Sequence, residues 1–189
     1  QKRTLSEINS DLKSNQKMFR LLQGDVGSGK TIVALCAAFN VIKSGFQVVV
    51  MTPTEILARQ HFLFAQKIFD KNINIEILSS KTENKDKKEI TEKLADKRID
   101  IVFSTHAVFQ KKIIFNKLGL IIIDEQHKFG VNQRKKLSDK GGDNCDVLLM
   151  SATPIPRTLT MTIYGDMDLS IISEKPKSRK DVKTYTKLE

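Results

Sequence analysis

The stretch FRLLQGDVGSGKTIVALCAAFNVIK, Phe19 to Lys43, decides the fold. An apolar run at Phe19 to Gln23 leads into GDVGSGKT, Gly24 to Thr31, which fits the spacing GxxxxGK[ST], and a helical pattern continues to Lys43. Glycines let backbone N–H groups turn around phosphate oxygens, and a helix N-terminus adds unpaired N–H donors and its dipole. Because strand, loop and helix follow in register, the stretch predicts a phosphate-binding loop rather than a glycine-rich turn that only caps a helix.

Short apolar runs alternate with longer amphipathic segments along the rest of the chain. Besides Phe19 to Gln23, the predicted strands are residues 47–51, 73–78, 99–103, 118–123 and 147–150. Strands separated by helices predict right-handed crossovers. We therefore expect an α/β fold of three layers, with a mostly parallel central sheet and helices on both faces.

Two segments between the strands are predicted to be helices with solvent-exposed faces. Leu57, His61, Phe64 and Ile68 mark one face of the first, and TPTE at residues 52–55 is expected to cap its start, with Thr52 as the N-cap. The second, residues 81–98, is dense in charge and has acid and lysine pairs four residues apart. We interpret it as a solvated helix rather than a dedicated nucleic-acid patch.

Length and composition limit the class of protein. With 189 residues the chain suits one domain, and no apolar run approaches the ~18 residues that a membrane span needs. Cys36 and Cys145 lack the spacing of a zinc site or a disulfide framework, so we expect two reduced, buried thiols in a cytoplasmic protein. No secretory signal is recognisable, and a first residue other than Met suggests a chain trimmed from a longer one. The net charge of +10 suits a polyanion partner, but it equally suits lysines that only decorate solvated faces.

Two carboxylates, Asp124 and Glu125, follow directly after the predicted strand 118–123. A Mg²⁺ ion on a triphosphate recruits few protein carboxylates, so Asp124 with the Thr31 hydroxyl would serve the metal, while Lys30 meets the β- and γ-phosphates. Glu125 would orient and deprotonate the attacking water. In a parallel sheet the carboxyl ends of strands share one edge, so Gly24 and Asp124 should converge there.

Five motifs together resemble those of superfamily 2 helicases: GDVGSGKT, TPTEILARQHF, STHAVFQ, DEQHKFG and SATPIPRTLTMTIYGDMDLS. The phrases DEQHKFGVNQR, MSATPIPRTL and YGDMD are most similar to the RecG family of bacterial branch-migration helicases. A second, weaker resemblance is to the transcription-repair coupling factors. The resemblance to the RecG family implies a RecA-like P-loop NTPase lobe at residues 1–172 that acts on branched or forked DNA. A linker at residues 173–189 would lead toward a second RecA-like lobe, and a DNA-wedge domain would precede residue 1.

The resemblance also assigns residues. It implies ATP and Mg²⁺ as cofactors, with Gln1 near the adenine. His127, Ser151 and Thr153 would couple the nucleotide state to the DNA face, although His127 equally suits a local structural role. Thr54, Arg59 and Thr105 would lie near DNA; helix capping is the alternative for Thr105, and Arg157 suits either a phosphate contact or a helix end. The residues that it implies for the nucleotide are Gln1, Gly24, Asp25, Val26, Gly27, Ser28, Gly29, Lys30 and Thr31.

Several positions depart from the family pattern: Ser79, Ser80, Lys81, Ser104, Lys128, Ser178 and Asp181. They weaken the implied DNA contacts and linker geometry but leave the nucleotide site untouched. Aromatic residues make up only 6% of the chain, so we expect backbone tracking that weakens with salt rather than base stacking. Two other classes stay open: a small-molecule P-loop kinase or metabolic ATPase, and a nucleotide-gated interaction module without catalysis.

Overall fold

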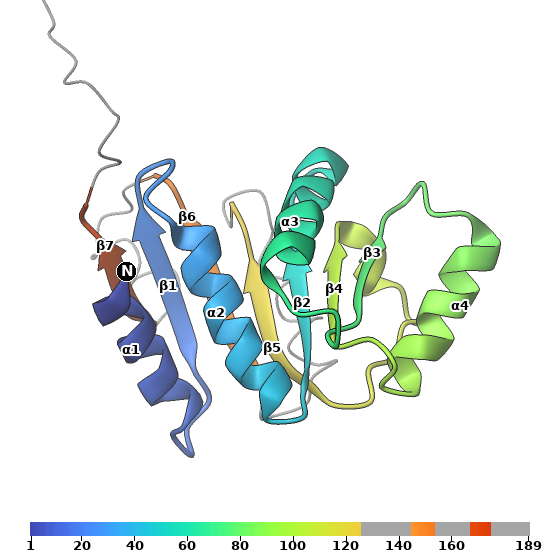
Figure 1. Ribbon diagram of the computed structural model, residues 1–189, viewed down its shortest axis with the longest axis horizontal. Coiled ribbons are helices and arrows are strands. Elements are labelled where there is room, and N and C mark those ends of the chain that lie inside the picture. The colour runs from blue at the N-terminus through green and yellow to red at the C-terminus, as the bar shows by residue number, and fades with distance from the viewer. Residues whose placement is uncertain (126–144, 154–166, 175–189) are drawn as a thin grey trace, which may run out of the picture.

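The computed structural model describes residues 1–125, 145–153 and 167–174, and the structural statements below refer to these ranges. The described elements alternate between helices and strands from α1 onward (Figure 1). In chain order they are α1 (Lys2–Leu12), β1 (Phe19–Gly24), α2 (Lys30–Lys43), β2 (Gln47–Met51), α3 (Glu55–Ile68), β3 (Ile75–Leu78), α4 (Asn84–Ala95), β4 (Ile101–Ser104), the short 3-10 helix η1 (His106–Phe109), β5 (Leu118–Ile123), β6 (Asp146–Ser151) and β7 (Asp168–Ile172).

The strands form one seven-stranded sheet in the order β3-β4-β2-β5-β6-β1-β7. Each neighbouring pair is parallel, as the alternation of strands and helices predicted. β1 pairs with β6 so that Gln23 lies opposite Ser151, and β5 pairs with β6 so that Ile123 lies opposite Leu149. The carboxyl ends of β1, β6 and β5 therefore lie side by side. We call this end of the sheet the carboxyl edge and the opposite end, where the parallel strands begin, the amino edge.

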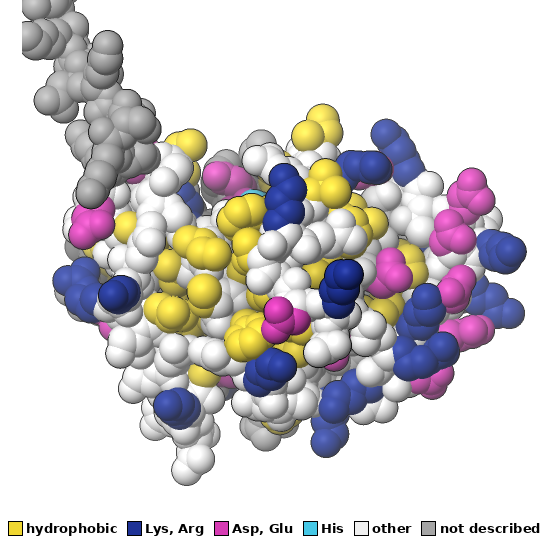
Figure 2. Space-filling model, in the orientation of Figure 1, with side chains coloured by type: hydrophobic (Ala, Val, Ile, Leu, Met, Phe, Trp, Pro, Cys, Tyr) yellow, Lys and Arg dark blue, Asp and Glu magenta, His cyan; other side chains and the backbone are white. Residues whose placement is uncertain are grey.

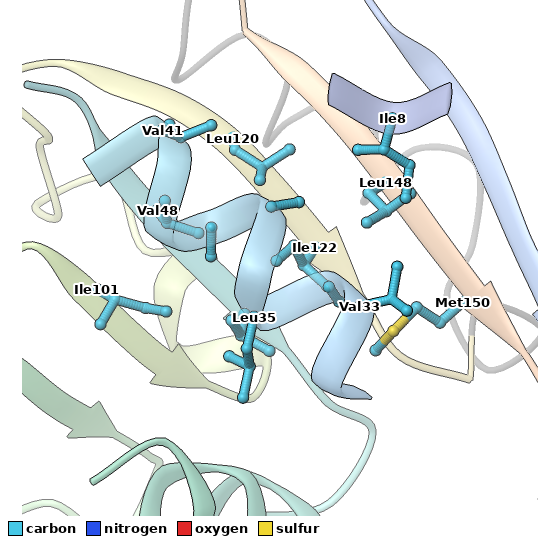
Figure 3. Packing of buried hydrophobic residues seen from close by; sticks show 14 of the residues in the cluster. Ile8, Val33, Leu35, Val41, Val48, Ile101, Leu120, Ile122, Leu148 and Met150 are labelled. Atoms are coloured by element: carbon cyan, nitrogen blue, oxygen red, sulfur yellow. The ribbon is translucent and has the colours of Figure 1, made fainter. Parts of the chain in front are cut away.

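Apolar side chains fill both faces of the sheet, which explains the uninterrupted apolar runs of the central strands. On one face, Val33 and Leu35 of α2 pack in one cluster with strand residues such as Leu148 and Ile122 (Figure 3). On the other face, Ile90 and other residues of α4 join alternate positions of the same strands. Because described helices cover both faces, the structure confirms the expected three-layer α/β fold.

The packing of α3 differs from the predicted one. Of the predicted face, His61 is buried, together with Ala58 and Ala65, whereas Phe64 and Ile68 are 38% and 39% exposed. The predicted face was shifted because small alanines allow the helix to approach the sheet closely, while the periodicity of large apolar residues pointed to a neighbouring stripe.

The predicted N-cap of α3 was also wrong. Thr54, not Thr52, caps the helix, since its side-chain oxygen accepts a hydrogen bond from the N–H of Leu57 at 3.3 Å. The Thr52 hydroxyl instead donates to the carbonyl of Thr54 at 2.8 Å, so Thr52 stabilises the turn that precedes the helix. The cap moved by two residues because Thr52 directly follows β2 and still donates its N–H to the carbonyl of Ser104 at the end of β4.

Two described elements, α1 and β7, were not predicted from the sequence. Arg20 of β1 joins both of them: its Nε lies 2.6 Å from Asp11 Oδ2 of α1, and its Nη1 donates to Ser170 Oγ of β7 at 2.8 Å. Arg20 is only 8% exposed, so this buried charge is compensated by partners from both neighbours. These polar contacts add to apolar packing, because Ile8 of α1 and Ile172 of β7 are buried in the core on one face of the sheet.

The surface follows the charge pattern of the sequence. Charged side chains of both signs gather over α4 (Figure 2), where Glu89 and Lys93 form an ion pair at 2.8 Å. This agrees with a solvated helix at residues 84–95.

The two cysteines differ in burial. Cys145 is buried, and burial raises the pKa of its thiol to about 12, whereas Cys36 is only half-buried, contrary to prediction. In the described ranges, no helix is long and apolar enough to span a membrane.

Candidate nucleotide-binding site

The phosphate-binding loop joins the carboxyl end of β1 to the first turn of α2. Gly27 and Gly29 have φ angles of 78° and 94°, in the left-handed region that favours glycine. Successive backbone units of this kind form a concave nest of N–H groups, and the first N–H groups of α2 have no acceptor within the helix. The loop therefore has the geometry and polarity of an anion site at a helix N-terminus.

Neighbouring atoms leave no room for side chains at the two ends of this loop. A Cβ on Gly24 would lie 2.6 Å from Ser28 Oγ, and a Cβ on Gly29 would lie 2.2 Å from Gln1 Nε2. Gln1 itself donates from Nε2 to the carbonyl of Ser28 at 2.8 Å. The structure thus places Gln1 against the loop, at the N-terminal end of α1, where the resemblance expected a nucleotide contact.

Lys30 lies within the loop and holds it together. Its Nζ donates to the carbonyl of Gly24 at 2.7 Å and to that of Asp25 at 2.9 Å. Burial lowers the pKa of Lys30 below its usual range, and the carboxylates of Asp124, Glu125 and Asp25 oppose this effect. Asp124 and Glu125 therefore lie close enough to Lys30 to act on its charge, although β6 separates β1 from β5 in the sheet.

Asp124 is held at the end of β5 by both backbone and side chain. Its N–H donates to the carbonyl of Met51 at 2.8 Å, and its Oδ1 accepts from the N–H of Glu125 at 3.0 Å. Glu125 has a φ angle of 52°, which is uncommon for a residue other than glycine. The regular strand conformation therefore ends at the acid pair.

His61 of α3 is the partner of Asp124 that sequence reasoning missed. Its Nε2 lies 2.8 Å from Asp124 Oδ2, and both residues are buried, at 8% and 9% exposed. An ionised carboxylate only accepts hydrogen bonds, so the imidazole donates. The sequence placed His61 on the inner face of a helix, but no spacing rule links positions 63 residues apart.

Ser151 and Thr153 lie at the end of β6, between the loop strand and the acid strand. The Oγ atoms of the two residues lie 3.0 Å apart, and the N–H of Thr153 donates to Ser151 Oγ at 3.2 Å. Gln23 of β1 donates to the carbonyl of Thr153 at 3.2 Å, which ties this turn to the phosphate loop. The predicted coupling partner His127 lies outside the described residues, as do Lys128, Arg157, Ser178 and Asp181.

Thr54, Arg59 and Thr105 also belong to this edge of the sheet or to the helix that begins there. Thr54 and Arg59 are exposed, whereas Thr105 is buried at 9% exposure and makes no side-chain cap bond with η1. Ser104, which departs from the family pattern, donates to the carbonyl of Leu78 at 2.8 Å and joins β4 to β3. Its hydroxyl therefore has a structural partner.

Comparison with known proteins agrees with this arrangement. The family model of the DEAD/DEAH box helicases matches residues 1–162, which include every described residue of the loop and the acid pair. The chain belongs to the DEAD/DEAH box helicase family. The resemblance to superfamily 2 helicases that the motifs predicted is thereby confirmed.

Within this helicase family the chain is similar to proteins called RecG. It is 52% identical over 186 residues to the ATP-dependent DNA helicase RecG of Bacillus subtilis, which covers 98% of this chain and 27% of that protein. A solved structure of RecG bound to a three-way DNA junction is 43% identical, with a TM-score of 0.82 over 96% of this chain and 24% of that one. The chain thus spans about a quarter of the length of these relatives.

A more distant structure supports the fold alone. The helicase Mss116, bound to single-stranded RNA and UDP-BeF, shares 23% identity and a TM-score of 0.67 over 93% of this chain and 40% of that one. With the RecG structure, it confirms the expected RecA-like fold. The helicase family therefore accounts for the fold, and the local geometry defines what the site can bind.

Proposed function

We propose that this chain is the ATP-binding lobe of an ATP-dependent DNA helicase that acts on branched DNA in replication-fork rescue, recombination and repair. One observation carries the proposal: the phosphate loop and the two carboxylates, separated by about half of the chain, meet at one edge of the sheet, where Asp124 and Glu125 act on the charge of Lys30. The similarity to proteins named ATP-dependent DNA helicase RecG supports the choice of substrate.

The residues at this edge fit ATP with Mg²⁺. The nest of the phosphate loop supplies N–H donors, and Lys30 would exchange its two carbonyl partners for phosphate oxygens. The Thr31 hydroxyl and Asp124 offer oxygen atoms, the ligand type that Mg²⁺ prefers, and a magnesium ion on a nucleotide keeps several waters. Bound Mg²⁺ would neutralise charge on the transferred phosphoryl group.

Glu125 is proposed to orient the attacking water and accept its proton. Asp124 is hydrogen-bonded at both oxygens by His61 and the N–H of Glu125, so we assign the metal to Asp124 and the water to Glu125. Ser151 and Thr153 connect the end of β6 to the phosphate loop through Gln23, which supports their proposed role in coupling with His127. Gln1, held against the loop at Ser28, is proposed to contact the nucleotide base.

DNA is proposed to run over the carboxyl edge, along the N-terminus of α3, with contacts from Thr54, Arg59 and Thr105. A capped helix N-terminus with exposed Thr54 suits a backbone phosphate. The neighbouring hollow of about 400 Å³ does not suit DNA, because its lining has more acidic than basic side chains. Its acids are Glu55, Glu76, Glu83, Asp86 and Glu89, and its bases are Arg59, Lys81 and Lys93.

The lobe is proposed to cover residues 1–172, with residues 173–189 as a linker to a second RecA-like lobe and with a wedge domain as a further partner. β7, which ends at Ile172, is still part of the sheet, and this supports the boundary. An arginine finger supplied by another lobe accelerates hydrolysis by roughly 10³- to 10⁵-fold, so this lobe alone should turn over slowly. Two free cysteines fit the reducing cytoplasm.

The experiment that tests the proposal compares Glu125→Gln with the wild type in the full-length protein. Affinity for ATP should be kept, because the phosphate loop is intact. DNA-stimulated turnover should fall by about 10²- to 10⁴-fold, since a positioned general base contributes that much. Glu92→Gln on the exposed side of α4 is the matched control and should behave like the wild type.

Three outcomes would redirect the assignment. Unchanged turnover in Glu125→Gln would remove Glu125 from the reaction. Stimulation of the wild type by a small phosphoryl acceptor, and not by branched DNA, would favour a kinase. Tight ATP binding without turnover, with or without DNA, would favour a nucleotide-gated interaction module.

A further inference from the structure

The contact between His61 and Asp124 stands out among the buried polar contacts of the described residues. It joins α3 to the end of β5 across 63 positions of sequence, with 2.8 Å between Nε2 and Oδ2. Both side chains are nearly inaccessible to solvent, at 10% and 12% exposed. A buried histidine could be only a packing residue, so its place relative to the nucleotide site decides its role.

We propose that His61 is a positioning residue that holds the carboxylate of Asp124 in the orientation needed for metal-bound nucleotide. The inference rests on the proposed function of this site and deepens it. Asp124 Oδ1 accepts from the N–H of Glu125, and Oδ2 accepts from His61, so the carboxylate is fixed at both oxygens. Each oxygen has further acceptor capacity, which remains for a metal ion or its water.

The surroundings of His61 support this role over simple packing. His61 and Thr31, the hydroxyl proposed for the metal, line the same cavity of about 10 Å³ between α2 and α3. The cavity places α3 beside the first turn of α2, and the hydrogen bond to Asp124 at 2.8 Å joins the imidazole directly to one of the two proposed metal residues. Groups that orient a metal-binding side chain from behind typically contribute about 10- to 100-fold in metal affinity or activity.

The helix that carries His61 gives the contact a second consequence. Thr54 caps α3, and its position lies about 10 Å along the helix axis from His61 at 1.5 Å per residue. Thr54 and Arg59 are the residues proposed to contact DNA. The first half of α3 therefore connects the proposed DNA surface to His61, which contacts the aspartate from the middle of the helix.

The test compares three variants in the full-length protein: His61→Leu, His61→Asn and His61→Gln. Glutamine can place an amide N–H where Nε2 lies, whereas asparagine is too short and leucine has no donor. Gln66→Leu, an exposed position of the same helix, is the matched control for α3. Thermal unfolding of every variant separates loss of packing from loss of positioning.

The first measurement is the affinity for a fluorescent ATP analogue with Mn²⁺ and with a chelator; the increase in affinity caused by Mn²⁺ is called the metal gain. The second is the Mn²⁺ EPR spectrum, which reports on the ligands of the ion. His61→Leu and His61→Asn should lose about 10- to 100-fold of this gain, with unchanged affinity in chelator. His61→Gln and Gln66→Leu should keep it. Equal metal gains in all His61 variants would overturn the proposal. The proposal would also be overturned if His61→Gln lost as much of the metal gain as His61→Leu and its melting temperature fell by the same amount.

The same measurements separate this proposal from the helicase assignment. If DNA does not stimulate wild-type hydrolysis but the metal gain follows the pattern above, the helicase assignment fails and the role of His61 stands. If the wild type binds no nucleotide, both fail. A branched DNA should also raise the metal gain in the wild type and not in His61→Leu, because coupling between two sites is reciprocal. An equal response in both would overturn the connection through α3.

Discussion

The two edges of the sheet treat buried polar residues in opposite ways. At the amino edge, Gln47 begins β2 and is almost fully buried; its Nε2 donates to the carbonyls of Leu94 and Ile99, and its Oε1 accepts from the N–H groups of Asn116 and Lys117. At the carboxyl edge, Asp124 is equally fixed but keeps acceptor capacity. One edge uses polar groups to hold loops together, and the other holds polar groups ready for a ligand.

The direction of the parallel strands explains this difference. The carboxyl edge gathers the N-terminus of α2, the left-handed glycines of the loop and side chains from distant strand ends. Helix N-termini favour anions, whereas the amino edge gathers helix C-termini, which favour cations. Helix α2 carries a lysine at each end: Lys30 at its N-terminus bonds to the carbonyls of the phosphate loop, and Lys43 lies at its C-terminus.

The sharpest test of this comparison replaces each of these lysines with methionine. Lys30→Met should lower kcat/KM for ATP by about 10²- to 10³-fold, the usual cost of one charge-stabilising donor at a reacting centre. Lys43→Met should leave it unchanged and cost at most about 1 kcal/mol of stability, because the Lys43 ammonium only lies over the Phe39 ring at 5.3 Å. Steady-state ATPase kinetics and urea unfolding measure both. Similar losses of activity would show that the edges do not differ.

Two glycines with positive φ provide a second, smaller test. Gly29→Ala should cost about 1–2 kcal/mol of stability from the left-handed backbone alone, and more because its Cβ would meet Gln1. Gly45→Ala, at the amino edge with a φ of 84°, carries the backbone cost but has room for a Cβ. Nucleotide affinity should fall only in Gly29→Ala. If it also falls in Gly45→Ala, the loop is not the local cradle that its geometry indicates.

The smallest expected effect concerns Asp146 at the amino edge. Burial raises the pKa of its carboxyl group. Two weaker effects lower this pKa: the N–H of Met18 donates to Oδ1 at 2.8 Å, and Lys17 contributes a positive charge. Between the unfolded and the folded pKa the native state binds more protons, so stability falls as the pH rises through this window. Asp146→Asn should therefore raise the melting temperature by a few degrees at pH 7. The gain should shrink toward pH 4, where the wild-type carboxyl is increasingly protonated. A pH-independent difference would contradict the burial argument.

Sequence patterns predicted the middle of the fold better than its margin. The bounds of β2 and β5 were predicted without error, since buried parallel strands are continuous apolar runs. α1 and β7 were missed because each buries only a few apolar residues, such as Ile8 and Ile172, and Arg20 adds polar contacts to both. The face of α3 was misplaced because small alanines occupy its buried positions, and its cap was misplaced because Thr52 forms hydrogen bonds within the turn before the helix.

The site was predicted as far as residue types and strand order allowed. GxxxxGK[ST] after a strand and two acids after another predicted the meeting of Lys30 with Asp124 and Glu125. Gln1 was associated with the nucleotide only through the family resemblance, and the structure adds its contact with Ser28. His61 was missed as the donor to Asp124 because no local rule pairs a helix residue with a distant strand end.

By itself, the sequence determined which residues form the loop proposed to bind phosphate and which strands are buried. Local spacing and apolar runs encode these properties within a few residues. Only the tertiary structure decided which distant groups became partners: His61 with Asp124, Gln1 with Ser28, and Gln23 with Thr153. The physical reason is that hydrogen bonds depend on distances of about 3 Å, which are set by how helices pack on the sheet and not by separation along the chain.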